Sequence, residues 1–233
     1  MTIQEKIQAH HERISGEHDR FRSWEHCYGY FRRTTPQGLS ADRYQAALQL
    51  AFYLASWGMY RGSSFLLQYS FTAHLGVIDV LGKPCFSELW EAEFGANRTD
   101  YDLVPKIIEA IDGIRTAYQP FAKRSASRQA SDTLVTKVIL GTFGCLPACD
   151  RYFIEGFKHA GFPYSRLNRN FIEQVLDFCQ RNSRGLNKAQ AAIEKTGGVR
   201  YPPMKLIDMY FWQIGFDISR RRAPHLRMNS RNA

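Results

Sequence analysis

The sequence predicts an all-α protein that folds as a single compact domain of many helices. Apolar side chains recur at three- and four-residue steps over most of the chain, which is the spacing of one helical face. No segment shows the apolar–polar alternation of a half-buried strand, and no internal repeat or sustained heptad is present. Because apolar residues make up 44% of the 233 residues, the chain can bury a substantial core.

The N-terminal segment is predicted to form two helices. Residues 3–14 follow Thr2, whose hydroxyl suits a helix cap. Residues 17–33 place large aromatic side chains at three- and four-residue steps, so one face of that helix is apolar. We treat residues 1–35 as a candidate N-terminal helical arm on a single domain that spans residues 1–233.

A loop and a central helix follow. Residues 34–40 contain proline and glycine and predict a loop, after which residues 41–57 predict a helix that is apolar all round and therefore central. From residue 46 to residue 78 the only formally charged side chain is Arg61. Because Arg61 divides this stretch into pieces shorter than the roughly 20 apolar residues that span a membrane, we expect buried core helices and no membrane partner.

The C-terminal part continues the helical pattern. Residues 168–182 are amphipathic, residues 183–187 interrupt the pattern, and residues 188–198 predict a short helix closed by glycine. Residues 201–218 form the last and most apolar predicted helix. Residues 219–233 contain five arginines and no acidic residue, which favours a basic, flexible tail.

The charge balance favours anionic partners. The formal net charge is +9, which favours nucleic acid and also improves solubility. The predicted partner is therefore DNA or another nucleic acid, with a protein partner as the open alternative. Candidate anion contacts are Lys123, Arg124 and Arg128 in a predicted exposed loop, Lys137 in the helix that follows, and Arg220, Arg221 and Arg222 in the tail.

A second candidate anion site lies where the central helix ends. The segment SWGMYRGSS, residues 56–64, places Arg61, Ser63 and Ser64 beside two glycines. Serine hydroxyls and free backbone N–H groups at a helix start, next to an arginine, can hold a phosphate or carboxylate. The alternative is a tight corner in which Ser63 caps the next helix and Arg61 pairs with an internal acid.

The cysteine and motif content predicts no cofactor and no metal site. The five cysteines are odd in number and no pair has the C-x2-C spacing of a zinc site, so we interpret them as small buried thiols. The sequence contains no Walker loop, dinucleotide-binding fingerprint or H-E-x-x-H motif. No apolar signal segment precedes the first helix, which predicts a reducing, cytoplasmic location.

The strongest functional pattern is TKVILGTFGCLPACDRYF, residues 136–153. It predicts an apolar helix that carries Lys137, a Gly/Pro corner, and a second helix with Pro147 at its first position and Asp150 in its first turn. A carboxylate there gains about 0.3–1 kcal/mol from the helix dipole without any catalytic role. The pattern alone leaves Asp150 open as a helix-start charge or an active-site group.

Residues 131–160, with this order of helix, corner and aspartate, resemble a segment of the helix-hairpin-helix DNA glycosylases. The resemblance implies a glycosylase-like helical architecture and gives Asp150 the family's catalytic role, in which a carboxylate stabilises positive charge on the sugar as the base leaves. Some family features are missing. Residues 122–132 contain no glycine-rich hairpin, Lys137 lies inside a helix instead of at the end of a hairpin, and no cluster of four cysteines follows.

Two functions follow from these patterns. The first is a nucleic-acid-binding protein that processes a base in the manner of a DNA glycosylase, with Asp150 as the catalytic residue. The second is a non-catalytic helical protein that binds a protein partner or a small anionic ligand near residues 57–64. The two differ in whether Asp150 faces a cleft of aromatic and basic side chains, which a flipped base requires.

Overall fold

The protein is all-α, as the sequence predicts, in a computed structural model that describes residues 1–34, 36–92, 94, 98–122, 129–196 and 199–229. Within these residues there are twelve α-helices, five short 3₁₀ turns and no strand. The α-helices are α1 Ile3–Ile14, α2 Ser23–Arg33, α3 Pro36–Ala41, α4 Arg43–Ser56, α5 Leu75–Leu81, α6 Ser87–Glu91, α7 Val104–Ala122, α8 Asp132–Gly141, α9 Arg151–His159, α10 Arg169–Arg181, α11 Ser183–Glu194 and α12 Pro203–Asn229.

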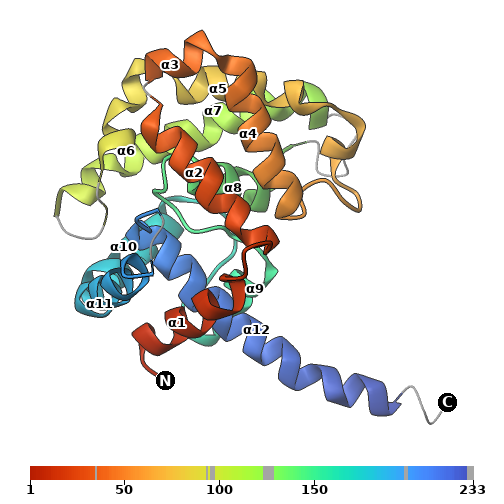
Figure 1. Cartoon of the computed structure of the whole chain (residues 1–233), viewed down its shortest axis with the longest axis vertical. Helices are drawn as coiled ribbons and strands as arrows, with labels where there is room; N and C mark the ends of the chain where they lie inside the picture. Colours follow the sequence, from red (N-terminus) through yellow and green to blue (C-terminus); the bar gives the residue numbers. More distant parts are fainter. Residues whose placement is uncertain (35, 93, 95–97, 123–128, 197–198, 230–233) are drawn as a thin grey trace.

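The helices form two groups that meet near the middle of the molecule (Figure 1). Helices α2–α8 gather in the upper part of that view, and α1 with α9–α12 gathers in the lower part. The longest helix, α12, packs against both α9 and α1, so the two ends of the chain lie in the same group. Thr2 caps α1 through a reciprocal pair of hydrogen bonds with Glu5, which confirms its predicted role.

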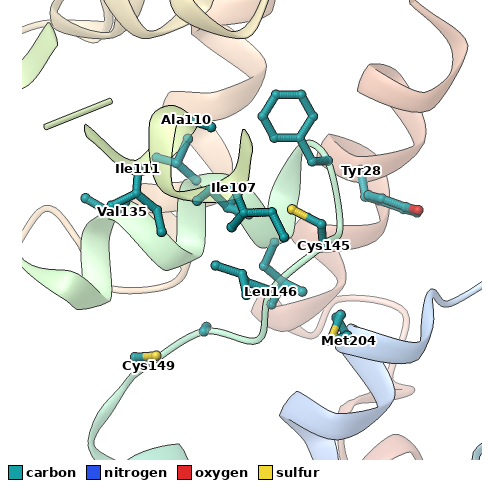
Figure 2. Packing of buried hydrophobic residues seen from close by; sticks show 14 of the residues in the cluster. Tyr28, Ile107, Ala110, Ile111, Val135, Cys145, Leu146, Cys149 and Met204 are labelled. Carbon is teal, nitrogen blue, oxygen red and sulfur yellow. The ribbon is translucent and has the colours of Figure 1, made fainter. Parts of the chain in front are cut away.

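An extended segment between α8 and α9 runs through the core. Its residues Cys145, Leu146 and Cys149 are at most 1% exposed. Figure 2 shows this segment among the buried side chains that include Ile107 of α7 and Met204 of α12. Because helices from both groups enclose the segment, the backbone that leads into α9 is held in place.

Helices α9 and α12 cross with their backbones in contact. A Cβ atom at Gly156 would lie 1.9 Å from the carbonyl oxygen of Phe211, and one at Gly215 would lie 1.9 Å from that of Tyr152. Both distances are far below van der Waals contact, so any larger residue would force the helices apart. The two glycines therefore set the spacing between the helices, and with it the position of Trp212 relative to the start of α9.

Two predicted irregular segments are helical in the structure. The predicted loop at residues 34–40 contains most of α3, which buries Leu39 completely. The predicted interruption at residues 183–187 is the first part of α11, where Leu186 packs into the core. In both places the burial of a leucine outweighs the weak helix propensity of a neighbouring glycine.

The basic C-terminal segment continues α12. The helix extends to Asn229, so residues 219–229 are helical where the sequence favours a flexible tail, and residues 230–233 lie outside the described residues. No described helix combines the length and apolar character needed to cross a membrane. The apolar stretch at residues 46–78 instead contributes α4 and part of α5 to the core.

Candidate functional site: a cleft around Asp150

A cleft of about 520 Å³ opens where the two groups of helices meet, and we call it the central cleft. Its walls come from α1, the 3₁₀ turn at Arg20–Arg22, the segment after α4, and helices α8, α9 and α12. The lining includes four large aromatic side chains, five basic side chains and two carboxylates, namely Phe21, Trp57, Tyr152 and Trp212; Arg20, Arg61, Lys137, Arg151 and Lys205; and Asp150 and Asp208.

Asp150 lies in the wall of the central cleft as the N-cap of α9. One carboxylate oxygen accepts the Phe153 backbone N–H at 3.0 Å, and the other accepts the Trp212 indole N–H at 3.1 Å. These bonds orient the half-buried carboxylate and leave lone pairs on both oxygens for a ligand. Because α9 begins at Arg151, the prediction that Pro147 starts this helix is wrong.

Hydrogen bonds from α8 and α12 keep the segment before α9 extended. Thr136 Oγ1 accepts the Cys149 N–H at 2.9 Å, and Thr133 Oγ1 donates to the Cys149 carbonyl at 2.7 Å. Asp208 accepts the Ala148 N–H at 3.1 Å. Since Thr133 already occupies the Cys149 carbonyl, which an additional helical turn would use as an acceptor, the helix starts late and its N-cap faces the central cleft.

Lys137 forms part of the buried floor of the central cleft. It is 5% exposed, and its ammonium group donates to the Trp57 carbonyl at 2.7 Å. Burial lowers the pKa of Lys137, while the carboxylates of Asp150 and Asp208 oppose that shift. Lys137 and Asp150 both line the central cleft, but the Lys137 ammonium group is buried and bonded to a carbonyl, so its contact with an anion stays a prediction.

Lys205 and Asp208 add a buried ion pair to the same floor, with 3.0 Å between the ammonium nitrogen and a carboxylate oxygen. The Lys205 nitrogen also lies 4.6 Å from the centroid of the Trp57 ring, whose face attracts a cation. Burial raises the pKa of Asp208, and the charge of Lys205 opposes that rise. A buried pair is costly unless it is fully bonded, and this one holds the backbone at Ala148.

Three exposed arginines line the outer part of the central cleft. Arg20, Arg61 and Arg151 form no ion pair within the described part of the chain. The Arg61 side chain lies over Gly58, where a Cβ atom would be 2.9 Å from Arg61 Nε and where φ is +74°. The positive φ favours glycine there, and the absence of a side chain leaves room for Arg61. Because Arg61 is exposed and forms no ion pair within the described residues, the alternative in which it pairs with an internal acid is wrong.

The other predicted anion contacts that the structure describes lie outside the central cleft. Ser63 is exposed, and Ser64 caps the following 3₁₀ turn by accepting the Leu66 N–H at 3.3 Å, so the capping role falls to Ser64 and not to Ser63. Arg220, Arg221 and Arg222 lie farther along α12, and Lys123, Arg124 and Arg128 lie outside the described residues. Of the predicted anion contacts that the structure describes, only Arg61 and Lys137 line the cleft with Asp150.

The central cleft also contains residues that the sequence interpretation missed. Lys205, Asp208 and Trp212 belong to a helix that the sequence presents as apolar. The available signal was a lysine and an aspartate three residues apart in that apolar run, the spacing of a pair on one helical face. His10 Nδ1 and Trp57 Nε1, both in lining residues, are buried and have no hydrogen-bond partner within the described residues. Such atoms are rare in folded proteins.

Within the described residues, no group of three or more histidine, cysteine or acidic side chains is placed to hold a metal ion. All five cysteines are free and four are buried, which confirms the interpretation as buried thiols except at Cys85. Comparisons of the chain with models of protein families, with curated proteins and with solved structures give no match. The resemblance to DNA glycosylases stays a prediction.

Proposed function

We propose that this protein binds nucleic acid, holds one nucleotide in the central cleft, and releases its base with the help of the Asp150 carboxylate. The observation that carries the proposal is the position of Asp150 in a cleft lined by aromatic and basic side chains. An aspartate that only caps a helix has no need of such a cavity. A nucleotide combines a flat ring with negative charge, so it is complementary to this lining.

The distribution of side chains favours a nucleotide over a simple anion. The aromatic rings offer surface for a base, and base–aromatic stacking contributes roughly 1–3 kcal/mol per base. The exposed Arg20, Arg61 and Arg151 supply positive charge at the entrance, where a phosphate backbone would pass. The volume of about 520 Å³ falls within the range of roughly 300–1,000 Å³ that small-molecule sites occupy.

Asp150 is suited to stabilise positive charge on a sugar. As the bond between sugar and base lengthens, the sugar gains oxocarbenium character, and a fixed carboxylate nearby lowers the barrier. The Trp212 indole and the Phe153 N–H hold the carboxylate in one orientation before the reaction, so little reorganisation is needed. Water then adds to the sugar, and the base leaves with a proton.

Binding is tested first, with labelled single-stranded and duplex oligonucleotides at low salt. We expect an affinity that falls steeply as salt rises, because phosphate contacts release counterions. Arg61→Gln should weaken binding. Arg169→Gln removes an equal charge from an exposed ion pair on α10, away from the cleft, and should leave binding unchanged. If neither kind of oligonucleotide binds at low salt, the proposal is refuted.

The chemistry is tested with Asp150→Asn, because asparagine keeps the helix cap and removes the charge. Asp42→Asn is the matched control, since Asp42 is the N-cap of α4 and accepts the Gln45 N–H at 3.2 Å outside the cleft. We expect Asp150→Asn to abolish release of bases from oligonucleotides that carry deaminated, alkylated or oxidised bases, and Asp42→Asn to retain it. Binding of oligonucleotides without any base release would overturn the catalytic part of the proposal and leave the binding part standing.

A further inference from the structure

Rings and arginines continue out of the central cleft along α12. Trp212, Phe216 and Arg220 follow one another at four-residue steps, which places them on one face of the helix. The Trp212 and Phe216 rings stack, with centroids 5.1 Å apart and an angle of 14° between their planes. Arg220 Cζ lies 5.9 Å from the Phe216 centroid. These three residues, with Arg13 and Tyr152 beside them, form what we call the α12 track.

Side chains from α1 and α9 widen the α12 track. Arg13 Cζ lies 4.1 Å from the Phe216 centroid and 5.2 Å from the Trp212 centroid. The Tyr152 ring meets the Phe216 and Trp212 rings edge-on, with centroid distances of 5.7 and 4.9 Å. Arg13 and Arg220 are exposed and the three rings are half-buried. The track therefore combines half-buried rings with exposed cations that lie over them.

The positive charge of the α12 track is available to an anion. Neither Arg13 nor Arg220 forms an ion pair within the described residues, and Asp217 of α12 and Glu155 of α9 each pair with a different cation. Arg13 donates one N–H group to the side-chain oxygen of Gln213, which leaves its other N–H groups for a ligand. A planar guanidinium group that lies over a ring still directs its N–H groups outward, where phosphate oxygens can accept them. Alternating rings and cations of this kind are complementary to the bases and phosphates of a polynucleotide.

We infer that the α12 track binds the nucleotides next to the one in the central cleft, and that the partner is single-stranded nucleic acid. This inference rests on the proposed function. Unpaired bases expose faces that can stack on Phe216 or Trp212, whereas a duplex encloses those faces. From Trp212 to Arg220 the helix rises by roughly 12 Å, which matches about three or four stacked bases at 3.4 Å each.

The dependence of affinity on strand length tests the α12 track. The probes are thymidine 5′-monophosphate, thymidylate oligomers of increasing length, and a single-stranded oligonucleotide with its duplex. We expect affinity to rise with length and to be higher for the single strand than for the duplex. Phe216→Leu keeps an apolar side chain and removes the ring, so the ratio of oligomer affinity to mononucleotide affinity should fall on the order of tenfold, the loss of one base stack.

Arg220→Gln and Arg169→Gln are the matched pair of charge variants, because each removes one exposed charge and only Arg220 lies on the track. Arg220→Gln should lower the same affinity ratio roughly two- to fivefold, and Arg169→Gln should leave it unchanged. Thermal melts establish whether Phe216→Leu is folded. If Phe216→Leu is not folded, the comparison of Arg220→Gln with Arg169→Gln shows whether the α12 track contributes to oligonucleotide affinity.

The outcomes separate the inference from the proposed function. Three outcomes would overturn the inference that the α12 track binds neighbouring nucleotides. They are an affinity that does not grow with strand length, a duplex that binds as tightly as the single strand, and equal affinity ratios for the two arginine variants. Each of them would leave the central cleft as a proposed nucleotide site. If the mononucleotide and every oligonucleotide fail to bind, the proposed function falls together with the track.

Discussion

Replacing Gly156 with alanine tests the backbone contact between α9 and α12. The added methyl group would lie 1.9 Å from the Phe211 carbonyl oxygen. Nonbonded atoms settle near roughly 3.5 Å, so the helices would have to separate by up to about 1.6 Å at this point. Because the obstructing oxygen belongs to the backbone of α12, no side-chain rotation relieves the contact.

The expected loss in the free energy of unfolding is about 2 kcal/mol. Overpacking an interior site costs about 1–3 kcal/mol and occasionally more, and alanine recovers at most about 1 kcal/mol through its higher helix propensity. The cost of overpacking should lie near the upper end of its range, because separation of the helices also strains the 3.1 Å hydrogen bond between Trp212 and Asp150. Subtracting the gain in helix propensity leaves a net loss of about 2 kcal/mol. For a chain of 233 residues, this corresponds to a fall in Tm of about 4–8 °C.

Thermal melts followed by circular dichroism measure this loss. Gly76→Ala is the matched control, since Gly76 is also helical and a Cβ atom there would make an ordinary contact, 3.5 Å from the Cβ atom of Ala117. The control should have an unchanged or slightly raised Tm. If Gly156→Ala also melts at or above the temperature of the unsubstituted protein, the helices are not in backbone contact and the reasoning is refuted.

Three further predictions concern titration, charge and thiols. Burial lowers the pKa of His74 to about 4 from 6.5, so the folded protein binds fewer protons than the unfolded chain between these values and loses stability as the pH falls through them. From roughly pH 7 to pH 5 the loss should be about 2 kcal/mol in urea titrations, with a shallower pH dependence in His74→Gln. Lys205→Met leaves the Asp208 carboxylate buried without its partner and should cost about 3–5 kcal/mol in the same assay, and less when Asp208→Leu is added. Cys85 alone should react quickly with a thiol reagent in the native protein, whereas all five cysteines should react after denaturation; fast reaction of a second thiol would contradict the described burial.

The helices themselves were largely predictable because core-facing residues repeat along each one. In α10, the residues at Phe171, Val175 and Phe178 mark the apolar face in the sequence and are buried in the structure. This information is local, since the 3.6-residue repeat of apolar side chains can be recognised within a few turns of sequence. The boundaries at α3 and α11 were missed because burial of single leucines by distant helices decided them.

The candidate site was predictable only in part. Asp150 could be singled out because helix, corner and aspartate are neighbours in the sequence. Trp212, which donates to its carboxylate, is 62 residues away, and the docking of α12 that brings it there depends on Gly156 and Gly215. The late start of α9 has a similar origin, because tertiary hydrogen bonds, in which Asp208 accepts the Ala148 N–H and Thr133 donates to the Cys149 carbonyl, hold these residues outside the helix.

The central cleft needs both α1 and α12, so it cannot form during synthesis before both helices have been made. His10 of α1 and Trp212 of α12 come from opposite ends of the chain, yet their rings meet with centroids 4.9 Å apart and both line the central cleft. Because synthesis releases the N-terminal helices first, the wall that holds the Asp150 carboxylate is absent until α12 has been synthesised. A nascent chain that lacks α12 therefore has no complete central cleft.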